Sequence, residues 1–358
     1  MPAHRLSALG VDTISIGFYP DEGDAGGTKT YLSHLNAALS SNWPSPHRAP
    51  VINVVGWYAQ TYPGEEFTGS QLMPLVQDIK AEYVRCGGAV RMVYEASVMP
   101  FQSWTGYTRD NPRKAQEVAR VMQALLDASS IDDDFAIAEI RLRFGHEVNY
   151  YTRSGLYPPP TGVDQGADFR EAFDQVALAC RALPGHYSRR IKMFWCPNIA
   201  STASRAMAEY ERFQPTMEYV GYVGIDYYCP APGCLDAADF VRKMKPLHDK
   251  YASRNRPFIL GETGLHFDAN EGAGTQAKLK WLRVVTGREA RSKLPHLSGV
   301  SWFNYEKDRD YRLIYVGPTE AAETAAFAQW LYERMAEEDK TEKRGGKVKK
   351  LWKTLMAG

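Results

Sequence analysis

The chain has 358 residues, enough for one large α/β barrel with insertions or for two smaller domains. Its 43 Lys and Arg residues nearly balance 42 Asp and Glu residues, and the formal net charge of +1 provides no basic field for binding nucleic acid. A content of 44% hydrophobic and 24% charged residues excludes wholesale disorder. No apolar run reaches the roughly 18 residues needed to cross a bilayer. We therefore expect a globular protein with no membrane span and no nucleic-acid partner.

Hydrophobic runs bounded by turn residues predict eight β-strands. In chain order they are Ile14–Pro20, Val51–Tyr58, Ala89–Ala96, Ile137–Asn149, Lys192–Asn198, Val220–Cys229, Phe258–Gly264 and Leu297–Tyr305. Runs such as VINVV and PFIL are apolar on both faces, which is typical of parallel strands that helices cover on both sides. The strands therefore favour a parallel sheet.

Segments between these strands carry apolar residues every three or four positions, the pattern of amphipathic helices. The stripes are Leu72, Leu75, Val76 and Ile79; Val118, Val121, Met122 and Leu125; Phe169, Phe173, Val176 and Cys180; Phe240, Met244 and Leu247; and Leu279, Leu282 and Val285. Eight βα units with no Pro-, Gly- or Ser-rich linker predict a single (β/α)8 TIM barrel. The alternative is a doubly wound sheet, but the only G-x-G-x-x-A match begins at Gly272, far beyond the first strand.

The composition changes at the C-terminus. Residues 340–353 contain seven Lys and Arg residues against the single Glu342. This pattern fits a basic amphipathic helix on an anionic surface or a solvated tail. We assign residues 1–338 to the barrel and residues 339–358 to a separate tail. Truncation after about Lys340 should leave turnover intact, as an activity assay of the shortened protein can test; a large loss in a protein that stays folded would place the tail in the site.

The five cysteines are an odd number, so at least one thiol should be free. Cys229 and Cys234 lie at the two ends of a short turn-rich loop. They either form a disulfide or remain two unrelated thiols, and the sequence leaves both alternatives open.

Two glutamates stand at predicted strand ends, where catalytic residues of such barrels lie. The fourth predicted strand ends in Arg143-x-x-His146-Glu147-x-Asn149, and Glu262 lies near the end of the seventh. The two carboxylates should face each other across the barrel mouth. Such a pair suits glycosidic cleavage, because one protonated carboxyl gives a proton to the leaving oxygen while the other, ionised, attacks the anomeric carbon.

These residues resemble the motifs of a known family. Arg143-x-x-His146-Glu147-x-Asn149 resembles the R-x-x-H-E-x-N signature of glycoside hydrolase family 26, and PFILGETG at 257–264 resembles its nucleophile strand. Further matches follow in order: MFWCPN at 193–198, GIDYY at 224–228 and VSWFN at 300–304. Each motif is weak alone, but five in the right order over roughly residues 14–317 form a strong signal.

The resemblance implies a retaining mechanism with Glu147 as general acid/base and Glu262 as nucleophile. It also implies that Tyr228 hydrogen-bonds the nucleophile. Arg143 and His146 would orient the two carboxylates.

Three more substrate-binding candidates come from the same resemblance. Asn149 would help to shape the site, and Trp302 would form the apolar floor beneath the sugar in subsite −1. Glu95 lies on the strand where many family mannanases place a His, and Tyr150 and Tyr151 occupy the region where they commonly carry a Trp. These departures leave the catalytic pair untouched but weaken the expectation that the sugar is mannose.

Aromatic residues make up 12% of the chain and are frequent in the loops after the third and fourth predicted strands. They are Phe101, Trp104, Tyr107, Tyr150, Tyr151 and Tyr157. Sugar rings stack on exposed aromatic faces, so these residues either line an open cleft for a polysaccharide or cap the top of the barrel.

We therefore expect a monomeric, retaining, endo-acting hydrolase of a β-linked polysaccharide such as β-mannan, β-glucan or xylan, with no metal or organic cofactor. A carbohydrate-binding barrel that has lost catalysis is the alternative. A serine hydrolase is disfavoured because the chain lacks a G-x-S-x-G elbow, and a zinc protease because no second histidine stands four residues after His146. The resemblance implies secretion, although the chain shows no signal peptide, and an intracellular enzyme is the other possibility.

Overall fold

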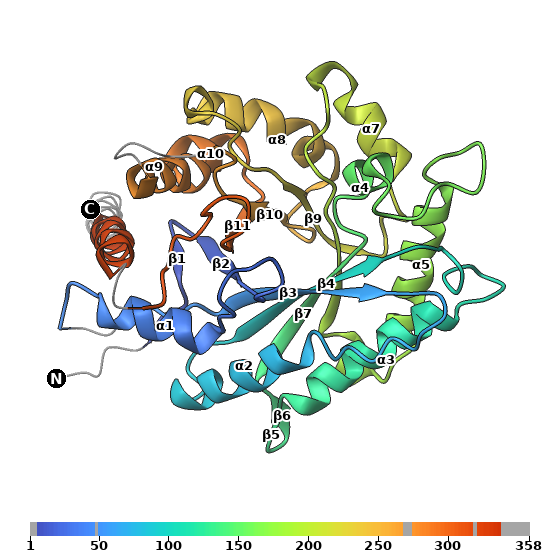
Figure 1. The fold of residues 1–358 in the computed structure, drawn as a ribbon, viewed down its shortest axis with the longest axis horizontal. Helices are drawn as coiled ribbons and strands as arrows, with labels where there is room; N and C mark the ends of the chain where they lie inside the picture. The colour runs from blue at the N-terminus through green and yellow to red at the C-terminus, as the bar shows by residue number, and fades with distance from the viewer. Residues whose placement is uncertain (1–5, 47–48, 268–273, 318–320, 338–358) are drawn as a thin grey trace, which may run out of the picture.

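The computed structural model describes residues 6–46, 49–267, 274–317 and 321–337. Eight parallel strands form a closed barrel surrounded by helices, as predicted (Figure 1). The barrel strands are β2 (Ile14–Pro20), β3 (Val54–Thr61), β4 (Met92–Pro100), β7 (Ile137–Phe144), β8 (Ile191–Trp195), β9 (Val220–Asp226), β10 (Phe258–Thr263) and β11 (Leu297–Asn304). They neighbour one another in the order β2-β11-β10-β9-β8-β7-β4-β3, and pairing of β2 with β3 closes the barrel.

Short strands and helices complete the barrel. The short strands are β1 (Gly10–Val11), which pairs with β2, and the hairpin of β5 (Ser130–Ile131) and β6 (Asp134–Phe135). The helices are α1 (Leu32–Ser41), α2 (Met73–Arg85), α3 (Arg113–Ala128), α4 (Val148–Ser154), α5 (Ala167–Arg181), α6 (Gly185–Ser188), α7 (Ala206–Arg212), α8 (Ala237–Tyr251), α9 (Gly274–Thr286) and α10 (Arg288–Lys293), with 3-10 turns at Ala203–Arg205 and Pro232–Cys234.

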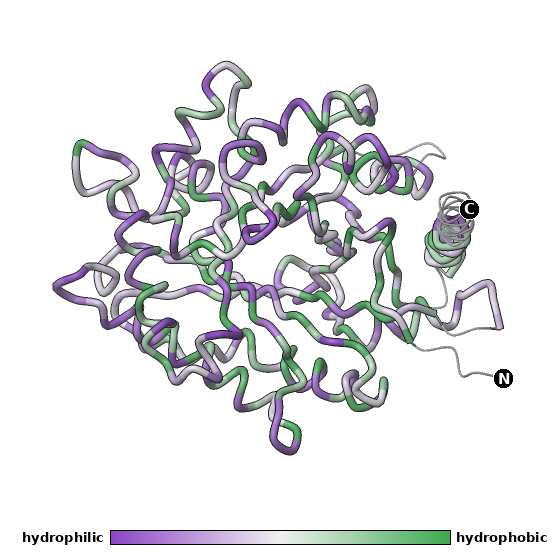
Figure 2. Tube along the Cα trace, turned by 180° about the vertical axis from the view of Figure 1, so that it is seen from behind, coloured by the Kyte–Doolittle hydropathy of each residue, from purple (hydrophilic) through white to green (hydrophobic). Residues whose placement is uncertain are grey.

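The predicted helical stripes face the barrel. Leu75, Val76 and Ile79 are buried in α2, and Met122 and Leu125 are buried in α3. Figure 2 shows hydrophobic stretches along the strands and the helix sides that face them, with hydrophilic residues in the outer loops. Burial of these stripes between the strands and the surrounding helices supplies the hydrophobic stabilisation of the fold.

One predicted strand is too long. β7 ends at Phe144 instead of Asn149, because Gly145 turns the chain with a φ of +60° and α4 begins at Val148. A Cβ at position 145 would lie 2.7 Å from the ring of Phe169, so this tight turn requires glycine. The result is that Glu147 lies in the turn between β7 and α4 rather than on the strand.

The last described segment, residues 321–337, is helical and lies beside α1 in Figure 1. The Phe327 ring packs edge-on against Phe18 of β2, and Tyr332 packs edge-on against Trp43 after α1. Residues 338–358 lie outside the described residues. The boundary near residue 338 and the tail of 339–358 therefore stay predictions.

Two further predictions concern cysteines and membrane helices. All five cysteines lie in the described part of the chain, and none of them forms a disulfide there. Cys229 donates to the carbonyl of Ala231 at 3.4 Å. Cys229 and Cys234 are thus two separate thiols. Within the described ranges, no helix combines the length and apolar character that crossing a bilayer requires.

Candidate active site

A cavity of about 740 Å³ opens where the barrel strands end. The structure brings four of the predicted site residues into its wall: His146, Glu147, Tyr228 and Glu262. They come from β7, β9 and β10 or the turns directly after them, because the carboxyl ends of parallel strands meet at one mouth of the barrel. The cavity is therefore the candidate active site.

Two neighbours donate hydrogen bonds to the Glu262 carboxylate. Arg143 donates from Nη1 to its Oε1 at 2.8 Å, and the Tyr228 hydroxyl donates to its Oε2 at 2.9 Å. Burial alone would raise the pKa of Glu262, but the positive charge of Arg143 and the hydrogen bonds that Glu262 accepts together outweigh burial, and the pKa lies below the usual glutamate value. His146 lies 3.8 Å from Oε1 through its Nε2. Glu262 is therefore ionised and aimed into the cavity.

Glu147 has the opposite electrostatic environment. Burial and the negative charge of Glu262 raise its pKa to about 7, and a hydrogen bond of 2.6 Å from Asn198 only partly offsets this. Its backbone adopts a left-handed φ of 54°, and its N–H donates to the carbonyl of Cys196 at 2.8 Å. Non-glycine residues rarely adopt this conformation, and such residues cluster at functional sites. At neutral pH a large share of Glu147 therefore carries a proton.

The two carboxyls thus differ in protonation although they share one cavity. Environments that push the pKa values of two acids apart assign one to proton donation and the other to nucleophilic attack. This is the division of roles that the resemblance implies for Glu147 and Glu262.

Arg143 is the centre of a buried network beneath the cavity. Its side chain is fully buried and donates to Tyr19 at 2.7 Å and to Asp226 at 2.5 Å, besides Glu262. Cys196 also donates to Asp226 at 3.1 Å. The network fixes the guanidinium so that it faces Glu262 without movement. Arg143 acts through Glu262, since it does not line the cavity.

Asp226 is a site residue that the sequence did not single out. It lines the cavity at the end of β9, and burial together with the charges of Glu262 and Glu147 raises its pKa against the pull of Arg143. Its position at a strand end inside the GIDYY motif was the available signal. Nothing in the sequence distinguished it from a structural acid paired with an arginine.

His146 is neutral, because burial and the charge of Arg143 lower its pKa to about 3. With Asp226 and Glu262 it offers three metal-ligand atoms within 4.8 Å of one another. Arg143, however, already donates to both carboxylates and supplies the positive charge that a metal ion would bring. These residues therefore fit an arginine-centred site better than a metal centre.

Asn149 shapes the site indirectly. Its amide pairs with the backbone of Asn198, accepting from N–H at 2.8 Å and donating to the carbonyl at 3.0 Å, and it donates to Glu209 at 2.7 Å. Asn198 in turn donates to Glu147. Asn149 thus positions Asn198, which in turn holds Glu147.

The structure does not place Trp302 and Glu95, two of the predicted substrate-binding residues, in the cavity wall. The Trp302 ring is fully buried, and its indole N–H donates to the carbonyl of Tyr311 at 2.8 Å. Glu95 is fully buried inside the barrel, where it accepts from Arg141 at 3.0 Å and from Ser301 at 2.6 Å. Neither residue lines the cavity.

Phe303 is the aromatic residue of β11 that lines the cavity. Its ring packs edge-on against Tyr228 with centroids 5.8 Å apart and stacks on Tyr305 at 4.1 Å. Side chains alternate across a strand, so the residue next to Trp302 faces the other way. Phe303 rather than Trp302 is therefore the aromatic residue of β11 that faces the cavity.

Some of the predicted loop aromatics line the cavity, and the others cap the barrel. Phe101, Tyr150 and Tyr151 line the cavity. Trp104 and Tyr107 are buried away from it and cap the barrel, as does Tyr157, whose hydroxyl donates to the carbonyl of His146 at 2.8 Å. The cavity therefore has aromatic walls on the side of β4 and α4.

No protein-family model matches the chain, and no curated protein matches its sequence. Its structure does match solved glycoside hydrolases. A modular endo-β-1,4-mannanase of glycoside hydrolase family 26 from Cellulomonas fimi aligns with a TM-score of 0.57 at 17% identity, over 88% of this chain and 70% of the mannanase chain.

Enzymes named for other substrates match as well. A GH5-4 broad-specificity endoglucanase from an uncultured bacterium gives a TM-score of 0.53 at 13% identity, over 90% of this chain and 96% of its own. One of two fungal β-1,4-galactanases gives a TM-score of 0.57 at 9% identity, over 88% of this chain and 100% of its own. At these identities the matches show a shared glycoside hydrolase-like barrel fold.

Proposed function

We propose that this chain is a retaining, endo-acting β-glycoside hydrolase that cleaves a β-linked polysaccharide by double displacement. The observation that best supports this proposal is the pair of carboxyls in one cavity, Glu147 with a pKa raised to about 7 and Glu262 with a lowered pKa. The glycoside hydrolase-like fold adds support.

In the first step, the Glu262 carboxylate attacks the anomeric carbon while Glu147 transfers its proton to the glycosidic oxygen. The C–O bond to the leaving sugar breaks, and a glycosyl ester forms on Glu262. Phe303 provides an apolar surface beside the reacting unit. Tyr228 and Arg143 then hold the ester where their hydrogen bonds held the carboxylate.

In the second step, Glu147 acts as a base. Once Glu262 is an ester, the negative charge that helped to raise the pKa of Glu147 is gone, so Glu147 ionises more readily. It takes a proton from water, the water oxygen attacks the anomeric carbon, and Glu262 leaves as a carboxylate. The same residue thus serves as acid and then as base.

The pH dependence of kcat/KM follows from these two acids. Activity should rise as Glu262 ionises below the usual glutamate pKa and should fall near pH 7 as Glu147 loses its proton. Asn198→Ala removes a hydrogen bond that stabilises the Glu147 carboxylate, so the falling limb should move to higher pH. Rate profiles of both proteins measure this. An unchanged falling limb in Asn198→Ala would contradict the assignment of Glu147 to it.

Substrate preference is a separate prediction. The strand on which many family mannanases place a His carries Glu95 here. Tyr150 and Tyr151, in the region where those enzymes commonly carry a Trp, line the cavity. We expect activity on a β-glucan or xylan, or narrow activity on decorated mannan. Efficient cleavage of linear mannan together with no cleavage of the other polymers would contradict this expectation.

Reducing-sugar release from linear mannan, mixed-linkage β-glucan and xylan tests the proposed function directly. A variant carrying both Glu147→Ala and Glu262→Ala is the control for contaminating hydrolases. Release by the native protein but not by the double variant supports the enzyme. Equal binding of a polymer by both proteins, with no release by either, would favour the carbohydrate-binding alternative.

A further inference from the structure

Glu22 lies in the cavity wall but takes no part in the proposed reaction. It follows β2, and its Oε1 accepts the backbone N–H of Tyr58 at 3.1 Å. Burial raises its pKa to about 7, and none of the salt bridges in the described residues includes it. A half-buried carboxyl without a paired cation costs free energy unless a ligand donates hydrogen bonds to it.

Two tyrosine hydroxyls lie in the same wall of the cavity. That of Tyr305 is close enough to Glu22, and that of Tyr58 close enough to Glu262, to lower the pKa of each carboxyl. The hydroxyls of Tyr58 and Tyr305 are buried and form no hydrogen bond of normal geometry with the described residues. Both residues line the cavity, and their rings meet edge-on with centroids 6.3 Å apart. Buried polar groups in native proteins are nearly always hydrogen-bonded. These hydroxyls and the Glu22 carboxyl are therefore available to the same bound molecule.

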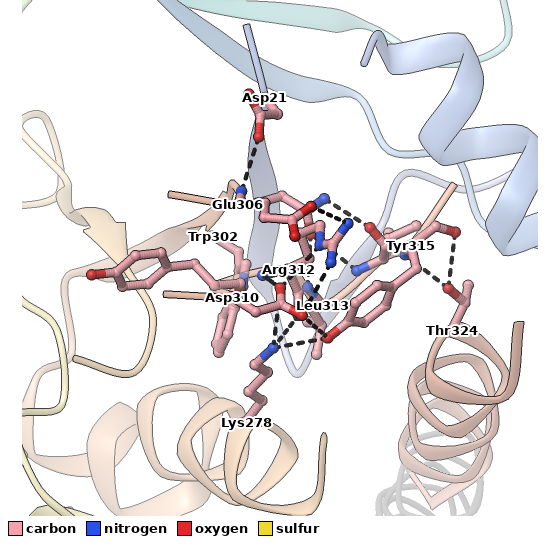
Figure 3. Close-up of polar contacts among 12 residues, drawn as sticks. Asp21, Lys278, Trp302, Glu306, Asp310, Arg312, Leu313, Tyr315 and Thr324 are labelled. Carbon is pink, nitrogen blue, oxygen red and sulfur yellow. Dashed lines mark hydrogen bonds and ion pairs between the residues drawn. The ribbon is translucent and has the colours of Figure 1, made fainter. Parts of the chain in front are cut away.

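The loops that carry these groups are held rigidly together. Figure 3 shows that Asp21, next to Glu22, accepts the backbone N–H of Glu306, next to Tyr305, at 2.9 Å. Arg312 pairs with Glu306 at 2.8 Å and accepts at its carbonyl from Lys278 of α9 at 2.6 Å. The loop after β2 is thus tied to the loop after β11. A pre-organised site binds its ligand without an ordering cost.

We propose that Glu22, Tyr58 and Tyr305 form a subsite that binds neighbouring hydroxyl groups of an uncharged sugar unit on the glycone side of the cleaved bond. This proposal rests on the proposed function. Tyr58 lies close enough to Glu262 to influence its pKa, and Glu262 is the residue that would carry the glycone. The subsite therefore adjoins the unit that becomes covalently attached.

The chemistry of the three groups favours hydroxyls over an ammonium group. A hydroxyl donates and accepts hydrogen bonds, and so matches a carboxylate acceptor beside two tyrosine hydroxyls. An ammonium group only donates. Lys307 lies over the rings of Phe303 and Tyr305, at 5.3 and 5.1 Å, and its positive charge opposes a cationic amino sugar.

The test compares Glu22→Ala and Glu22→Gln with Glu66→Gln, a matched control in an exposed loop away from the cavity. The probes are cellotetraose, mannotetraose, xylotetraose, their O-methylated counterparts and the chitosan tetrasaccharide. Glu22→Ala should lower kcat/KM for the preferred unmodified tetrasaccharide by about 10- to 100-fold, mainly through KM. Glu22→Gln should lose less, and Glu66→Gln should match the native protein.

Methylation distinguishes a sugar contact from a structural role. The O-methylated tetrasaccharide cannot donate to Glu22, so Glu22→Ala should cost little with this probe. Three results would overturn the proposal. The first is an equal loss of kcat/KM by Glu22→Ala on the unmodified and the methylated probes, and the second is a kcat/KM of Glu22→Ala within about twofold of native. The third is a preference of the native protein for the chitosan tetrasaccharide that Glu22→Ala abolishes.

A protein that binds sugars without cleaving them can still be tested for this subsite. If the native protein cleaves no tetrasaccharide, calorimetric binding of the same probes still compares native and Glu22→Ala proteins. Weaker binding of an unmodified tetrasaccharide by Glu22→Ala would support the subsite without catalysis. Equal affinity of the two proteins, or binding of none of the probes, would refute it.

Discussion

Glu262→Ala should lose turnover by on the order of 10⁴-fold or more, the scale seen when an enzyme loses a residue of its covalent machinery. The alanine leaves no group to attack the anomeric carbon. It also opens space beside Arg143, which keeps Asp226 and Tyr19 as partners. Added azide should occupy that space and restore cleavage of a 2,4-dinitrophenyl β-glycoside. The product should be a glycosyl azide of inverted configuration, because azide attacks only once.

Thermal unfolding of Glu262→Ala separates lost chemistry from lost folding. We expect a cooperative transition close to that of the native protein, and Glu66→Gln should keep both its stability and its activity. Retention of native turnover by folded Glu262→Ala would contradict the nucleophile assignment. A glycosyl azide of retained configuration would do the same.

Glu147→Ala should show a loss that depends on the leaving group. With a polysaccharide the first step needs a proton, and turnover should fall by about 10²- to 10⁴-fold. With a 2,4-dinitrophenyl β-glycoside the leaving group needs no proton, so the first step should survive and the glycosyl ester should accumulate on Glu262. A burst of dinitrophenolate followed by slow turnover measures this.

Azide tests the role of Glu147 in the second step. It needs no base, so it should release the ester from Glu147→Ala as a glycosyl azide of retained configuration. Equal losses of Glu147→Ala on the polysaccharide and on the activated glycoside would exclude Glu147 as the acid. Asn198→Ala is an informative companion, because it keeps the carboxyl and removes a hydrogen bond that lowers its pKa.

The sequence was sufficient to predict the barrel and the location of the two glutamates. Eight apolar runs alternate with helical stripes, and a closed parallel barrel covered by helices buries all of them. Strand ends then single out Glu147 and Glu262. The predicted strand end at Asn149 was wrong, because the chain turns at Gly145 with a φ of +60° and β7 ends at Phe144.

The direction in which individual side chains point could not be predicted in the same way. Trp302 and Phe303 are adjacent aromatics on a strand that is buried on both faces, so hydrophobicity does not indicate which of them faces the cavity. Glu95 was a substrate-binding candidate from the resemblance, but its hydrogen-bond partner Ser301 is 206 residues away in the chain. Such pairings depend on barrel register, which the sequence pattern does not specify.

The anomeric configuration of the first product tests the central claim most directly. Proton NMR during hydrolysis, recorded before the product equilibrates, identifies whether the β-linked substrate yields a β or an α hemiacetal. Retaining glycosidases hold their two carboxyls about 5–5.5 Å apart and act by double displacement. The roles assigned to Glu147 and Glu262 therefore predict retention, with the β anomer formed first. An α anomer first would mean a single displacement by water, and it would contradict the roles assigned to Glu147 and Glu262.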